Sequence, residues 1–169
     1  MLSDHALSTS GVGVQSRFLI NGLIDKGCWT VRQFGAAIKH TNYDVSEVNE
    51  DFIIRPIDGF GNKDLIRQTL AAEKPDVLLL FTDPRFFIWL FEMEDEIHRT
   101  CPIAYWHVWD NYPYPSYNEV LWDSVDLLNC HSYLTYQLCS KAFPDKTNFV
   151  PHSLPPDLFF PMPDEQVLD

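Results

Sequence analysis

The chain has 169 residues, of which 46% are hydrophobic and 14% aromatic, and its formal net charge is -12 at pH 7. This composition excludes intrinsic disorder, and the length favours one domain that can bury roughly two thirds of its unfolded surface. The Lys and Arg residues are scattered along the chain, so we expect no nucleic-acid partner. The apolar runs are too short to cross a bilayer, and no transmembrane segment is expected.

The cysteines indicate a reducing compartment. None stands in C-x-x-C spacing and no secretory signal pattern follows Met1, so we expect reduced thiols and a cytoplasmic location. Cys130-His131 and the nearby Cys139 raise the question of a zinc site or a thiol nucleophile. Neither four ligands nor a partner base can be assembled from sequence neighbours, so no metal site is predicted.

The first unit of the chain is a strand, a glycine loop and a helix. Met1–Asp4 has the character of the end of a strand, and helical periodicity follows the loop up to Gly27. Free N–H groups and the helix dipole at Gly11, Val12 and Gly13 favour a phosphate or diphosphate. Glycines that serve only a tight turn deserve about equal weight. The third glycine of G-x-G-x-x-G would fall at residue 16, where serine stands, so a nicotinamide cofactor is disfavoured.

The rest of the chain alternates between strands and helices. Apolar runs that end in turn residues predict six further strands, at Trp29–Ile38, Phe52–Ile57, Asp76–Phe81, Ile103–Trp106, Val125–Asn129 and Asn148–Val150. Helices are expected after Asn62, from Pro84 to just before Cys101, over 118–123 and over 133–143, with a polar surface excursion at 39–51. This pattern predicts an α/β fold with a Rossmann-like parallel sheet and helices on both faces.

His107 follows one of these predicted strands, and a ligand bound in an open α/β sheet lies beyond the carboxyl ends of the strands. Asp110 and Asp83, at the exits of neighbouring strands, are candidates to contact the same ligand. A half-buried histidine satisfied by a backbone carbonyl is the alternative for His107. The acidic cluster at 92–96 is interpreted as a solvated helix face because helical spacing sends its carboxylates in different directions.

Four ordered features together resemble family 4 of the retaining glycosyltransferases. They are the glycine loop at 11–13, the strand that ends in His107, the Asp126-x5-Ser132 stretch, and V-P-H-S-L-P-P-D-L-F-F-P at 150–161. The resemblance covers essentially the whole chain, as the N-terminal half of the two-domain GT-B architecture. His152 and Ser153 depart from the Asn and Gly that are usual in the last motif.

The resemblance implies metal-independent transfer of a sugar from a nucleotide-diphosphate sugar to an acceptor, with retention of configuration. The sugar nucleotide is then a donor substrate, and no cofactor is needed. His107 is implied to be the catalytic residue, hydrogen-bonding a hydroxyl of the transferred sugar. The substrate-binding residues are expected to be Gly11, Val12, Gly13, Asp83, Asp110 and Ser132.

This interpretation divides the chain into a domain and a linker. Residues 1–152 are expected to form the acceptor-side domain, for a glycan, lipid or protein acceptor, and residues 153–169 a linker toward a nucleotide-sugar-binding domain that the chain lacks or that is a separate subunit. The isolated chain is then expected to be inactive. The apolar linker residues favour self-association as a homo-oligomer. The alternatives are a non-catalytic glycan- or protein-binding module of the same fold and another nucleotide-binding Rossmann enzyme.

Overall fold

The computed structural model of the chain describes residues 1–37, 43–109, 111–114 and 116–162. They form an α/β fold around an eight-stranded sheet with the strand order β3-β4-β2-β1-β5-β6-β7-β8. Neighbouring strands are parallel, except that β3 and β4 are antiparallel. The expected α/β class with a Rossmann-like, mainly parallel sheet is confirmed.

The strands are short, and the longest helix of the described residues, α1, follows the first strand. The strands are β1 (Leu2–Asp4), β2 (Val31–Ala36), β3 (Ser46–Asn49), β4 (Phe52–Pro56), β5 (Leu78–Thr82), β6 (Ile103–His107), β7 (Leu127–Cys130) and β8 (Thr147–Phe149). The helices are α1 (Gly11–Asp25), α2 (Lys63–Glu73), the 3₁₀ helix η1 (Pro84–Phe87), α3 (Ile88–Phe91), α4 (Glu94–His98), α5 (Asn118–Asp123) and α6 (Tyr133–Ala142).

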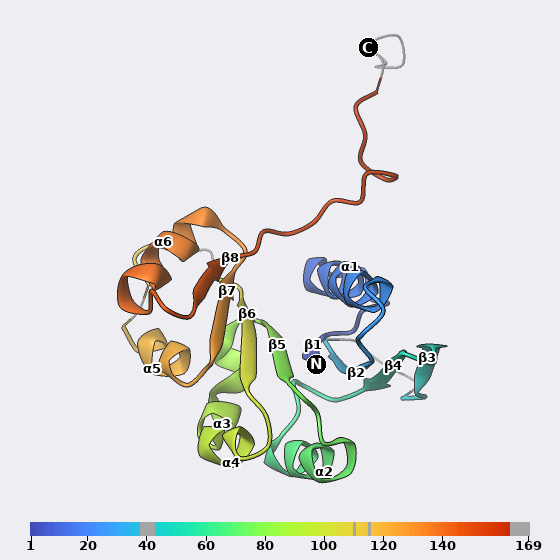
Figure 1. Cartoon of the computed structure of the whole chain (residues 1–169), viewed down its shortest axis with the longest axis horizontal. Helices are drawn as coiled ribbons and strands as arrows, with labels where there is room; N and C mark the ends of the chain where they lie inside the picture. Colours follow the sequence, from blue (N-terminus) through green and yellow to red (C-terminus); the bar gives the residue numbers. More distant parts are fainter. Residues whose placement is uncertain (38–42, 110, 115, 163–169) are drawn as a thin grey trace.

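Helices flank the sheet unequally, since α1 lies on one side and α2 to α6 lie on the other (Figure 1). The connection from β1 to β2 runs toward one edge of the sheet, whereas those from β4 onward run toward the opposite edge. Right-handed crossovers therefore place α1 and the later helices on opposite faces. Two hydrophobic clusters correspond to these faces: a small one with Ile20 of α1, and a large one with Ile66 of α2 and Trp122 of α5.

Two sequence predictions need correction. The 39–51 segment lies at the surface over its described part, as predicted, but the prediction lacked β3, an edge strand paired with β4 across an irregular register at Glu47 and Asn49. The helix expected from Pro84 onward is instead three short segments. The backbone leaves helical geometry at Phe87 and Met93, two buried residues, because packing of their side chains overrides local helix propensity.

The chain leaves the sheet after β8 as an extended segment that points away from the body (Figure 1). Its start is attached to α1, because Gln15 Nε2 donates to Ser153 O and Ser153 N donates to Gln15 Oε1, both at 3.0 Å. Its exposed apolar side chains are Leu154, Leu158, Phe159, Phe160 and Met162. In the part of the chain that the structure describes, no helix has both the length and the apolar character needed to span a membrane.

Candidate functional site

The topology singles out the carboxyl ends of β1 and β5. β1 pairs with β2 on one side and with β5 on the other, so the strand order reverses between β1 and β5. A crevice forms where the connections from two adjacent parallel strands diverge to opposite faces, and ligands of open α/β sheets bind there. The loops that border this point are residues 5–10 after β1 and the Asp83 turn after β5.

The first turn of α1 offers backbone donors at this point. The Ser10 side chain caps the helix, accepting from Gly13 N at 2.9 Å, and Val14 N donates to Ser10 O at 2.9 Å. Gly11 and Val12 come before Val14, the first residue whose N–H has a backbone acceptor in the helix. Among the described residues the helix therefore offers no acceptor to their two N–H groups, which are available to a ligand or to water. The structure therefore brings Gly11, Val12 and Gly13 to the carboxyl edge, as the sequence predicts.

The two glycines of this turn stand in different surroundings. A Cβ at Gly13 would lie 2.3 Å from Ser8 Oγ and 2.5 Å from His5 O, whereas nothing lies within 4 Å of a Cβ at Gly11. Close packing of the loop against the helix alone accounts for glycine at position 13. At position 11 the space outside the helix is open, and a ligand could approach the backbone there.

Asp4, which sequence reasoning did not select, lies at the same place. Ser10 Oγ donates to Asp4 Oδ2 at 2.6 Å, and Asp4 as a whole is 8% exposed. Burial raises the pKa of its carboxyl group, and the Ser10 hydrogen bond partly opposes that change. None of the ion pairs among the described residues includes Asp4. The sequence signal that could have identified Asp4 is an acidic residue at the end of the first strand, β1, which lies in the middle of the sheet.

His107 lies in the core rather than in an open crevice. Its residue exposure is 0%, and Trp122 Nε1 donates to His107 Nε2 at 3.1 Å. Burial, with a smaller effect of the neighbouring His131, lowers the pKa of the imidazole to about 3, so it is neutral at pH 7. The sugar contact that the resemblance implies for His107 stays a prediction, and it requires the residues that cover the ring to move.

The other predicted residues have local structural partners. The Asp83 carboxylate caps η1, accepting from Arg85 N at 2.8 Å, and also pairs with the Arg85 guanidinium. The Ser132 hydroxyl caps α6 and accepts from Thr135 N at 3.1 Å. Asp110 lies outside the described residues. Asp83 and Ser132 can bind a ligand only in addition to, or in place of, these capping bonds.

Two further histidines, also not selected from the sequence, meet at the exits of β7 and β8. The rings of His131 and His152 stack with their centroids 4.8 Å apart, and His131 Nδ1 donates to the His107 carbonyl oxygen at 3.0 Å. Burial, and secondarily His131, lower the pKa of His152. Position 152 is where the sequence departs from the usual Asn, and here the imidazole also packs edge-on against Trp106.

The charge at this edge favours hydroxyl groups over phosphates. Arg85 is the one Lys or Arg in the described exits of β1, β5, β6, β7 and β8, and Asp83 pairs with it. Asp4 places a carboxyl group against the positive end of the α1 dipole, which weakens its attraction for an anion. Carboxylate, hydroxyl and backbone N–H groups together can both accept from and donate to a polyol.

Two other hollows lie away from this point. One, of about 200 Å³, is lined by Met1, Trp29 and Pro75 at the amino ends of the strands. The other, of about 270 Å³, lies between α1 and the sheet beside Trp106 and Val150. The first hollow lies where connections do not diverge around a switch point, and the second lies beside β6 and the exit of β8 rather than between β1 and β5. We therefore place the candidate site at the carboxyl ends of β1 and β5.

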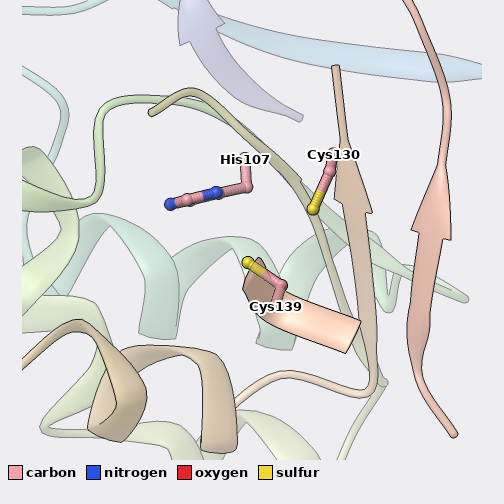
Figure 2. A group of neighbouring side chains, drawn as sticks. All are labelled: His107, Cys130 and Cys139. Carbon is pink, nitrogen blue, oxygen red and sulfur yellow. The ribbon is translucent and has the colours of Figure 1, made fainter. Parts of the chain in front are cut away.

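Three potential metal ligands gather below that edge, on the side of the sheet covered by α2 to α6. The side chains of His107, Cys130 and Cys139 offer ligand atoms that all lie within 4.8 Å of one another (Figure 2). Sequence spacing could not bring them together, because they come from two strands and a helix.

The fold and the site define a Rossmann-like α/β protein with polar groups gathered at a topological switch point. Comparisons of the chain with protein-family models, with curated proteins and with solved structures find no match. The resemblance to the family 4 glycosyltransferases rests on the sequence features alone.

Proposed function

We propose that this chain is the N-terminal, acceptor-side half of a GT-B retaining glycosyltransferase. The reaction is metal-independent transfer of a sugar from a nucleotide-diphosphate sugar to a glycan, lipid or protein acceptor. The half that binds the nucleotide is a further domain or a separate subunit, so the isolated chain has no turnover. The observation that carries this proposal is the convergence of Asp4, Ser10 and the free amides of Gly11 and Val12 at the β1/β5 switch point.

The charge of the crevice supports an acceptor role rather than a nucleotide-binding role. A diphosphate needs fixed positive charge or several donors, and the described edge contributes one paired arginine and two free amides. An uncharged sugar hydroxyl needs one acceptor and one donor, which Asp4 and the start of α1 supply. The other half of the enzyme would therefore bind the nucleotide, as the family resemblance implies.

The test is a binding experiment on the isolated chain, followed residue by residue with amide NMR signals. Methyl and octyl glycosides of several hexoses should shift the amide signals of Gly11, Val12 and Asp4, whereas UDP-glucose should shift them no more than the matching free hexose. Saturable binding of UDP-glucose at these amides, or robust transfer by the chain alone, would overturn the half-enzyme assignment.

The alternative is a non-catalytic glycan- or protein-binding module, and the enclosure of His107 favours it. If His107 never contacts a sugar, the residue to which the resemblance assigns catalysis has a structural role instead. Glycoside binding by the isolated chain, combined with no transfer after a nucleotide-sugar-binding domain is supplied, would support the binding module.

A further inference from the structure

The cluster formed by His107, Cys130 and Cys139 has the features of a built site. His107 is the last residue of β6 and is paired in register with Cys130 of β7, while Cys139 comes from α6, which packs on β7 and β8. All three residues have 0% exposure. Figure 2 shows the side chains of His107, Cys130 and Cys139 beside one another, and their ligand atoms all lie within 4.8 Å of one another.

The hydrogen bond from Trp122 decides which imidazole nitrogen carries the proton. An indole N–H can only donate, so His107 Nε2 must be the acceptor and Nδ1 must hold the hydrogen of the neutral ring. His107 Nδ1 is buried and has no hydrogen-bond partner among the described residues. A buried N–H without an acceptor calls for an explanation, and a sulfur anion in the cluster is an acceptor that would satisfy it.

The two thiols are neighbours. The side chains of Cys130 and Cys139 hydrogen-bond each other, and both residues have 0% exposure. Because the thiolate is the form that ligates a metal, a cation that binds here must displace the thiol protons and stabilise two thiolates in an apolar surrounding.

We propose that Cys130 and Cys139 bind one Cu(I) ion as a pair of thiolates, with His107 Nδ1–H donating to a thiolate sulfur instead of ligating the metal. Binding forms two Cu–S bonds, releases the two thiol protons to solvent and changes no oxidation state. The orphaned Nδ1–H then acquires an anionic acceptor, which compensates part of the single negative charge of the bis-thiolate complex.

The donor set selects Cu(I) over Zn²⁺. Structural zinc takes four ligands, whereas this cluster offers two sulfurs and a nitrogen that already carries a proton. Thiolates are soft ligands that favour Cu(I). Zn²⁺ binding through Nδ1 would require the proton to move to Nε2 and the Trp122 hydrogen bond to break.

The experiment is an anaerobic titration of the reduced full chain with Cu(I), supplied as its acetonitrile complex in competition with bicinchoninate. A Cys28→Ser background removes the exposed thiol. We expect one tightly held Cu(I) per chain. Cys139→Ser should weaken binding by more than about 100-fold, because loss of a ligand exceeds the 10- to 100-fold effect of losing an outer contact. Cys101→Ser, which changes a buried thiol outside the cluster, should leave the affinity unchanged.

Two measurements on the loaded Cys28→Ser chain need no further variant. X-ray absorption at copper should show two sulfur neighbours and no nitrogen, and ¹⁵N NMR of the imidazole should show the His107 proton still on Nδ1. The proposal is overturned if no Cu(I) is retained, if Cys139→Ser retains it as tightly, if nitrogen ligates copper, or if the proton moves to Nε2.

Discussion

The carboxyl ends of β1 and β6 show how two similar sequence positions reach opposite environments. Asp4 ends β1 beside the open first turn of α1, with Ser10 as its polar partner. His107 ends β6, but its side chain points to the helix-covered face, where Trp122 of α5 packs on it and donates to it. A polar residue at a strand end therefore becomes a ligand contact only where the following segment leaves that face uncovered.

The largest expected effect tests the enclosure of His107. Replacing it with Ala leaves the buried Trp122 N–H unpaired and opens a cavity, so the free energy of unfolding should fall by about 3 kcal/mol in urea denaturation. His98→Ala, which removes a partly exposed ring bonded to Asp126, should cost less than about 1 kcal/mol.

A second measurement on His107→Ala separates structure from catalysis. In the enzyme completed by its second half, turnover per folded molecule should be normal if His107 is only structural. A thirty- to thousand-fold loss, roughly 2 to 4 kcal/mol of transition-state stabilisation, with an unchanged thermal midpoint would restore the sugar contact and contradict the enclosed arrangement.

The next effect concerns the start of α1. Gly13→Ala should destabilise the fold by about 2 kcal/mol, because the new methyl group overlaps Ser8 Oγ and the His5 carbonyl oxygen. Gly11→Ala meets open space and should change stability by less than about 0.5 kcal/mol. Equal losses for the two variants in thermal unfolding would show that the loop geometry is wrong.

Acid should reveal the neutral imidazole of His107. Its folded pKa of about 3 lies below the unfolded value of about 6.5, so the unfolded chain binds one more proton between these pH values. Stability contributed by the neutral ring is present above pH 6.5 and is lost as pH falls, by about 1.4 kcal/mol per pH unit. His107→Gln should lack this part of the slope, and an identical pH profile would contradict the burial.

Asp4 should show the opposite dependence on pH. Because burial raises its folded pKa, the folded state favours the protonated acid, and stability decreases as pH rises from about 3.9 through that raised value. Asp4→Asn keeps an acceptor for Ser10 and should raise stability at pH 7 by about 0.5 kcal/mol, with no gain at pH 3. Asp145→Asn on the exposed surface is the control, and a loss of stability at pH 7 would refute the assignment.

The smallest effect on stability is expected at the C-terminal segment. A chain ending at Leu154 keeps the two Ser153 hydrogen bonds to Gln15, and it should unfold within about 0.5 kcal/mol of the full chain, since the described side chains that it loses are mostly exposed. It should nevertheless lose the self-association that Leu158, Phe159 and Phe160 drive as an apolar surface. Sedimentation at high concentration compares the two, and a strictly monomeric full chain would contradict this.

The sequence by itself determined the α/β class, most of the strands and the capping residue Asn62. These depend on local chemistry: apolar runs such as the one over β5 need burial on both faces, and caps satisfy orphan N–H groups within three residues. The glycine loop at Gly11 to Gly13 was also predicted between a strand and a helix, because such a loop is a local pattern.

Only the tertiary structure decided which polar residues are accessible and which meet. The direction of the His107 ring follows from strand alternation and from the helices that cover that face, and the approach of Cys130 to Cys139 follows from the packing of α6. The same holds for the edge strand β3, whose pairing with β4 overrides its polar composition. Such contacts depend on packing between segments distant in sequence, which no local pattern of residues encodes.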